Sequence, residues 1–163
     1  IEFLPKVLSD LDNITWREQM AWADTLGGLS IASGGVTLPH GIGMQISGHC
    51  PSVFHGLSLS VIYPEFTRFT YVSAVEDFAR VGRLFNPALN MTGDEEAARH
   101  CCEEIDKFIK EIGMWTSFKK LGIDPDQVRE IADCGHVLND YKNTPRIADI
   151  DENYEMMMSA YDR

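Results

Sequence analysis

The stretch LPHGIGMQISGHCPSVFHG, residues 38–56, continued by LSLSVIYPEF, residues 57–66, decides the fold. It contains two His-Gly pairs, His40-Gly41 and His55-Gly56. Glycine, proline and small residues separate the pairs, which predicts a short helix or turn over residues 40–48 and a second helix over 54–71. The second segment is apolar on nearly every side, which favours a buried helix. An imidazole therefore stands at the start of each helix.

An imidazole at the entrance of a buried helix can bind a metal ion or carry a proton. The same spacing allows a second interpretation. Both histidines could be core residues that are hydrogen-bonded to backbone carbonyls. A single pair of histidines at this separation is a weak motif and leaves both interpretations open.

The composition is that of one soluble, globular, all-helical domain over residues 1–163. Hydrophobic residues make up 44% of the chain and charged residues 24%, which suits a domain with a sizeable core. The net charge of −11 argues against binding to a phosphate backbone, so no nucleic acid is expected. No run reaches the ~18 apolar residues of a membrane span, and no signal peptide is present. The absence of these segments predicts a cytoplasmic protein. Because the first residue is Ile1 and not methionine, the sequence is also expected to be cut from a longer chain.

The four cysteines form no Cys-x-x-Cys pair, so they are expected to be buried thiols in a reducing compartment. They are Cys50, Cys101, Cys102 and Cys134.

The remaining pattern predicts an all-α bundle of about seven to nine helices without strands, because no stretch alternates with period two. The other expected helices cover about residues 1–11, 15–33, 73–85, 92–112, 124–133 and 149 onward, with a further turn over 136–141. Capping signals mark five of the starts. These signals pair Thr15 with Glu18, Ser73 with Glu76, Thr92 with Glu95, Asp124 with Gln127, and Asp149 with Glu152.

Two features inside the predicted helices oppose helix formation. Gly27 and Gly28 each cost about 1 kcal/mol against alanine, which close approach of a helix or a ligand would explain. Pro64 is expected to kink its helix or to lie over a broken hydrogen bond.

The two His-Gly segments resemble the metal-binding segment of the iron-containing (group III) alcohol dehydrogenases. In that family a second ligand histidine opens a long apolar helix that ends near a proline, as residues 55–64 do here. The small-residue segment 26–30 and the segment Asn143-Thr144-Pro145-Arg146, followed by Asp149, resemble other parts of the family. The resemblance covers essentially the whole chain, but only about the C-terminal two-fifths of a family member. It implies a multi-helix bundle like the C-terminal domain of the dehydroquinate synthase-like and iron-type alcohol dehydrogenases.

The resemblance also implies a function. His40 and His55 would be metal ligands in an enzyme that interconverts alcohols with aldehydes or ketones by using NAD or NADP. The divalent metal, iron or zinc, would act as a Lewis acid. The nicotinamide cofactor would be bound mainly by an N-terminal domain outside this chain, so the fragment alone is expected to be inactive. Its partners would be a small alcohol or aldehyde and that N-terminal domain. Because that domain is missing, an apolar surface patch is expected near His40, and copies of the chain could associate non-natively through it.

Three departures from the family limit what carries over. The family's Asp-x-x-x-His ligand pair is absent, and no glycine-rich dinucleotide loop follows a strand pattern. Met44-Gln45 stands where many members have an extra histidine, and the interval between the ligand histidines is one residue longer. Catalytic and cofactor-binding residues are therefore not assigned.

The other histidines, His49, His100 and His136, are expected to be surface or structural residues. His49, in the hinge between the two motif histidines, is the one that could line the site. Phe54 and Trp22 are expected to be core residues that could also form pocket walls.

Two alternatives remain open at this point. The chain could be a metal-free helical interaction module, in which the side chains of His40 and His55 point apart. It could also belong to a relative of the glycerol dehydrogenase or maleylacetate reductase type.

Overall fold

A computed structural model describes all residues from 1 to 163 and contains helices but no strand. This confirms the predicted all-α class and the predicted number of helices. The α-helices are α1 Phe3–Ser9, α2 Ile14–Gly34, α3 Leu38–His49, α4 His55–Thr70, α5 Val75–Phe85, α6 Asp94–Glu111, α7 Pro125–Asp133 and α8 Ile150–Ser159. Three short 3-10 helices, η1 Tyr71–Ser73, η2 Pro87–Met91 and η3 Asn139–Asn143, connect them. No helix is both long enough and apolar enough to span a bilayer.

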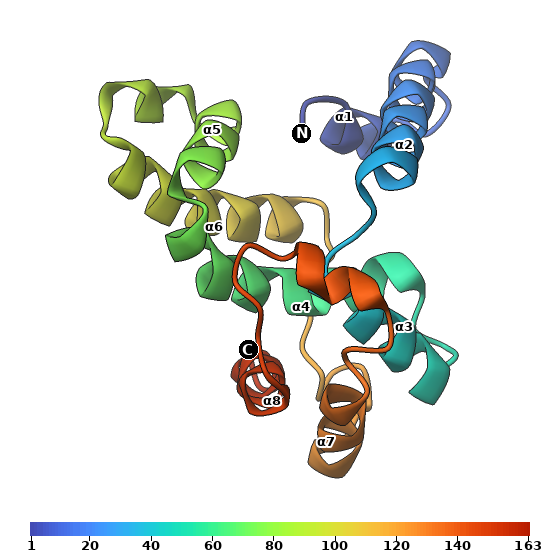
Figure 1. The fold of residues 1–163 in the computed structure, drawn as a ribbon. Coiled ribbons are helices and arrows are strands. Elements are labelled where there is room, and N and C mark those ends of the chain that lie inside the picture. Colours follow the sequence, from blue (N-terminus) through green and yellow to red (C-terminus); the bar gives the residue numbers. More distant parts are fainter.

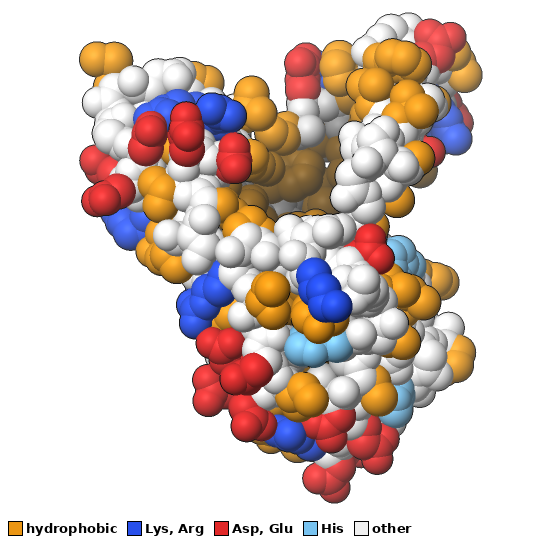
Figure 2. Space-filling view, in the orientation of Figure 1, with side chains coloured by type: hydrophobic (Ala, Val, Ile, Leu, Met, Phe, Trp, Pro, Cys, Tyr) orange, Lys and Arg blue, Asp and Glu red, His pale blue; other side chains and the backbone are white.

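The body of the molecule is formed by α3, α4, α7 and α8, and two helix pairs extend from it (Figure 1). One pair is α1 with α2 and the other is α5 with α6. The space-filling view shows a hollow between the two pairs whose walls carry many hydrophobic side chains (Figure 2). The main core lies in the body and includes Leu38, Ile42, Ile46, Val61, Ile62, Phe118, Ile131 and Met157.

The two helix pairs differ in burial. Helices α5 and α6 have a small core of their own, made by Ala79, Leu89, Ala97 and Ala98. Helices α1 and α2 contain no buried residue. The prediction that Trp22 belongs to the core is wrong, because its side chain is 59% exposed on α2. An ideal Cβ at Gly27 or Gly28 would have no neighbour within 4 Å, so no residue of the chain makes the close approach expected there.

Two of the five predicted capping boxes form. The boxes at Asp124 and Asp149 are complete, with both reciprocal hydrogen bonds present. The other three do not form, because α2, α5 and α6 begin next to residues other than the predicted hydroxyls. Their N-caps are Asn13, Ala74 and Gly93, and only Asn13 accepts a hydrogen bond through its side chain.

Helix α4 runs through Pro64 without ending there. Proline has no N–H, so the carbonyl of Ser60 one turn earlier loses its helical partner. The guanidinium of Arg163 donates to that carbonyl at 3.4 Å and to the carbonyl of Val61. Arg163 also forms an ion pair with Glu65 at 3.0 Å. The broken hydrogen bond predicted at Pro64 is thus replaced by a side chain from the other end of the sequence.

Helix α4 is not buried on all sides, contrary to the expectation. It buries Val61 and Ile62, but Tyr63 is partly exposed and Phe54, just before the helix, is 78% exposed. Phe54 is therefore not a core residue.

The cysteines also differ from the expectation. Cys101 and Cys102 are buried and Cys50 is partly buried, whereas Cys134 is exposed at the end of α7.

Candidate metal centre

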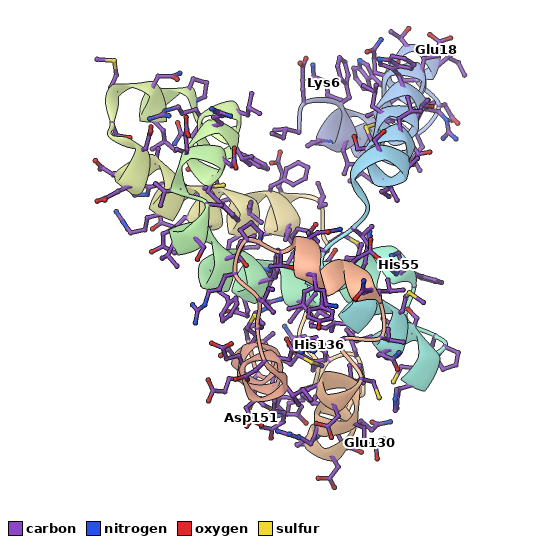
Figure 3. The ribbon with its side chains drawn as sticks, viewed as in Figure 1. Lys6, Glu18, His55, Glu130, His136 and Asp151 are labelled. Atoms are coloured by element: carbon purple, nitrogen blue, oxygen red, sulfur yellow. The ribbon has the colours of Figure 1, made fainter.

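The starts of α3 and α4 bring the two predicted histidines together. His40 lies in the first turn of α3, next to Pro39, and His55 is the first residue of α4. The ring centroids of His40 and His55 are 5.1 Å apart, and the ring planes are inclined by 26° in a stacked arrangement. The predicted convergence of two helix starts is therefore present, with the two imidazoles as immediate neighbours. His55 is labelled at the edge of the body in Figure 3.

Glycines in α3 allow this approach. A Cβ at Gly43 would lie 3.0 Å from Oγ of Ser58 and 3.5 Å from Cε1 of His55. On the other side of the helix, a Cβ at Gly41 would lie 2.5 Å from the carbonyl oxygen of Gly135. Side chains at these two positions would push α3 away from α4 and from the segment after α7. The glycines beside His40 therefore set the spacing of the histidine pair.

The surroundings of His40 favour the neutral form of its ring. Burial lowers the pKa of His40 below its ordinary value, the neighbouring His55 lowers it further, and the carboxylate of Asp140 raises it. The Nδ1 atom of His40 is buried and has no hydrogen-bond partner in the chain. Buried polar atoms of this kind are rare in folded proteins and point to a missing ligand or proton partner. A neutral imidazole is also the form that binds metal ions.

A small surface cavity of about 190 Å³ opens beside His40. It is lined by Gly35, Val36, Thr37, Pro39, His40 and Tyr63. The α2–α3 junction therefore forms one wall and α4 contributes the aromatic ring of Tyr63.

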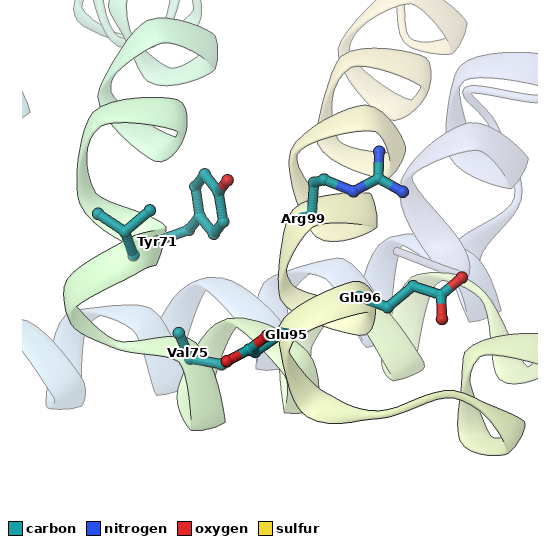
Figure 4. A pocket seen from close by; sticks show the side chains of 6 residues that line it. Tyr71, Val75, Glu95, Glu96 and Arg99 are labelled. Atoms are coloured by element: carbon teal, nitrogen blue, oxygen red, sulfur yellow. The ribbon is translucent and has the colours of Figure 1, made fainter.

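A larger cavity, of about 490 Å³, lies between η1, the start of α5 and α6, away from the histidine pair. It is lined by Tyr71, Val72 and Val75 together with Glu95, Glu96 and Arg99 of α6 (Figure 4). Two glutamates and an arginine are its charged lining residues, and no histidine or cysteine lines it. The paired imidazoles and the orphaned nitrogen make the smaller cavity the better candidate.

The other histidines lie apart from this pair and have their own partners. His49 is 3.6 Å from the carboxylate of Glu130 on α7. His100 bonds to Glu103 within α6 at 2.8 Å. The ring of His136 stacks on Tyr141 with centroids 4.0 Å apart, and its Nε2 lies 2.9 Å from the carbonyl oxygen of Ala148 (Figure 3). These contacts agree with the surface or structural roles expected for them.

The two histidines supply two donors for a metal ion, not a complete set. No group of three or more His, Cys, Asp or Glu residues in the chain is placed to hold an ion. Protein metal sites commonly use three or four protein donors. The stacked pair and the unpartnered Nδ1 fit half of such a site.

A family model identifies the family to which the chain belongs. The model of the Fe-containing alcohol dehydrogenase family, C-terminal, matches residues 1–161, so this chain is a member of that family.

Relatives with known names are distant in sequence. The chain is 24% identical over 159 residues to an NAD-dependent methanol dehydrogenase of Bacillus methanolicus, a match that covers 98% of the chain and 42% of that enzyme. It is also 24% identical over 128 residues to a long-chain primary alcohol dehydrogenase of Thermoanaerobacter ethanolicus, covering 78% of the chain and 32% of the relative. The chain thus spans about two-fifths of the first of these relatives and about a third of the second.

Solved structures share the fold. A 1,3-propanediol oxidoreductase superposes with a TM-score of 0.90 at 20% identity, covering 96% of this chain and 41% of that one. An archaeal alcohol dehydrogenase from a Red Sea brine pool gives a TM-score of 0.91 at 21% identity, covering 98% and 41%. The predicted likeness to the helical domain of the iron-type alcohol dehydrogenases is confirmed.

The structure adds one residue that the sequence reasoning missed. Asp140, in η3, is the acid that acts on the pKa of His40 although 100 residues separate the two in sequence. No periodicity or motif in residues 136–141 marks it, so only the tertiary fold identifies it.

Proposed function

We propose that this chain is the C-terminal helical part of a metal-dependent alcohol dehydrogenase that interconverts alcohols with aldehydes or ketones by using NAD or NADP. The observation that carries this proposal is the stacked pair of imidazoles from the starts of α3 and α4, 5.1 Å apart. Membership of the Fe-containing alcohol dehydrogenase family supports the reaction class.

In this proposal His40 and His55 each give one ring nitrogen to a divalent metal ion. A metal ion there would supply Lewis-acid chemistry toward the oxygen of an alcohol or carbonyl substrate. The lowered pKa of His40 favours the neutral ring, which has a lone pair to give, and Gly43 leaves room for the ring of His55. Iron is the metal in the family's name, and zinc also suits imidazole donors.

The remaining metal donors would come from parts of the catalytic unit outside this chain, which include part of the helical domain, and most of the nicotinamide-binding residues would come from an N-terminal nucleotide-binding domain. The chain spans only about two-fifths of the methanol dehydrogenase it matches, which is consistent with this division. We therefore expect the 163-residue chain alone to be inactive. The substrate class proposed is a small alcohol or aldehyde, which the relatives named for methanol and 1,3-propanediol favour.

Two observations oppose the alternative of a metal-free interaction module. That alternative expects the two side chains to point apart and to make structural hydrogen bonds. The rings instead stack on each other, and Nδ1 of His40 is buried without a partner.

Zinc binding to the 163-residue chain tests the ligand assignment. Isothermal titration with Zn²⁺ is expected to give one weak site that is lost in His40→Ala and in His55→Ala. His100→Ala is the matched control, because His100 lies on α6 and pairs with Glu103. Unchanged Zn²⁺ binding in both His40→Ala and His55→Ala would contradict the assignment.

Activity is then tested in the protein that carries this chain together with its nucleotide-binding part. The same substitutions at His40 and His55 are expected to abolish the NAD(P)-dependent oxidation of short primary alcohols and the metal content together.

A further inference from the structure

The segment that contains η3 holds the junction between α2 and α3 by side-chain contacts. The backbone N–H of Val36 donates to Oδ1 of Asp140 at 3.2 Å. The side-chain amide of Asn143 donates to the carbonyl of Val36 at 3.1 Å. The N–H of Leu38, at the start of α3, donates to Oγ1 of Thr144 at 3.2 Å. Three side chains from one short segment therefore bind the backbone immediately before His40.

The contact between Asp140 and this junction is close. Gly35 has a φ of +71°, and a Cβ on it would lie only 2.5 Å from Oδ1 of Asp140. The positive φ favours glycine at this position, and the absence of a side chain lets the carboxylate lie against the backbone. Gly35 and Val36, which contact Asp140, line the same cavity as His40. The carboxylate thus stands directly behind one wall of the candidate site.

The junction matters because α2 is otherwise loosely held. The substantial helix contact of α2 is with α1, and neither helix buries a residue. The contacts with residues 140–144 therefore set both the direction of α2 and the start of α3. The field of the Asp140 carboxylate also reaches the ring of His40.

We infer that Asp140 is a positioning residue of the metal site: its carboxylate fixes the α2–α3 junction and places a negative charge behind the cavity wall that Gly35 and Val36 form beside His40. This inference rests on the proposed function, since it assumes that His40 is a metal ligand. Acidic groups behind a ligand histidine commonly strengthen metal binding by holding the ring and by their charge. Because Nδ1 of His40 has no partner in the chain, Asp140 would act through the α2–α3 junction and its charge, without holding the ring and without contacting the ion.

The test compares Zn²⁺ binding to the 163-residue chain and to three variants by isothermal titration. Asp140→Asn keeps an oxygen that can accept from the N–H of Val36 but removes the charge, and is expected to weaken Zn²⁺ binding about tenfold. Asn143→Ala keeps the charge and removes the two hydrogen bonds that Asn143 donates to the carbonyls of Gly34 and Val36, so a smaller loss of affinity is expected. Asp24→Asn removes an equal charge from the exposed face of α2 and is expected to match the wild type.

Hydrogen exchange at the Val36 amide reports the junction itself. Slow exchange in Asp140→Asn shows that the fold is intact, and faster exchange is expected in Asn143→Ala. The inference is overturned if Asp140→Asn binds Zn²⁺ as Asp24→Asn does, or if Asn143→Ala loses as much affinity as Asp140→Asn. If Asp140→Asn binds Zn²⁺ as Asp24→Asn does while His40→Ala still loses binding, the role of Asp140 is overturned and the proposed function stands. Absence of binding by the wild type would overturn the ligand assignment itself.

Discussion

The two helix pairs that extend from the body differ in what holds them. In α5 and α6 the backbones approach so closely that a Cβ at Gly82 would lie 2.7 Å from the carbonyl of Ala97. In α2, Gly27 and Gly28 have no neighbour within 4 Å of such an atom. Both pairs are helical, but only α5 and α6 bury residues against each other. Helical periodicity therefore predicts that a face will be covered, without indicating which residues cover it.

The largest difference between the pairs is expected in thiol reactivity. Burial raises the pKa of Cys101, on α6, to about 12, so its thiolate fraction is about a thousandfold below that of an ordinary thiol. A cysteine introduced on α2 by Ala23→Cys is expected to react with iodoacetamide at the rate of a free thiol. Mass spectrometry of the labelled peptides measures both rates, and unfolding in urea should make them equal. Equal rates in the folded chain would mean that α6 is as open as α2.

The next largest effect is expected on stability, from a substitution at the close contact of α5 and α6. Gly82→Ala places a methyl group against the carbonyl of Ala97 and the side chain of Cys101. We expect the free energy of unfolding to fall by about 1–3 kcal/mol, measured by urea denaturation. A stable Gly82→Ala protein would show that the α5–α6 contact is looser than described.

The same substitution in α2 should have the opposite sign. Gly27→Ala meets no neighbouring atom and gains helix propensity, so α2 should become more stable by up to about 1 kcal/mol. Slower hydrogen exchange of the α2 amides is the measurement. Destabilisation by Gly27→Ala would reveal a contact on that face in solution.

The smallest effect is expected at Trp22. Its side chain is 59% exposed, so Trp22→Gln should change the unfolding free energy of this chain by less than about 0.5 kcal/mol. Denaturation curves of the two proteins should superpose, and a clear loss of stability would show that the indole is packed in solution.

Sequence reasoning predicted the parts of the fold that depend on neighbours in sequence. The helix expected over residues 40–48 is found over 38–49, and that over 54–71 is found over 55–70. The Asp124 and Asp149 caps form because Asp at each N-cap is followed by a Gln or Glu three residues later. The boxes at Thr15, Ser73 and Thr92 fail because the N-cap of each helix lies one or two residues away from the predicted one.

The parts it missed depend on residues far apart in the chain. The exposure of Phe54 and Trp22 depends on which atoms cover them, which their own apolar character does not reveal. The bond between Val36 and Asp140 joins residues 104 positions apart, and nothing in the local pattern of either residue indicates it. The neighbouring positions of His40 and His55 were predicted from helix starts and a family resemblance, whereas the carboxylate behind them was not.

The replacement of the lost helical bond at Pro64 has a consequence for how the chain matures. The donor is Arg163, which is 103 residues away from Ser60 in sequence. During synthesis on the ribosome, α4 therefore emerges long before the guanidinium that completes it. The carbonyl of Ser60 therefore has no guanidinium donor from this chain until residue 163 has been synthesised.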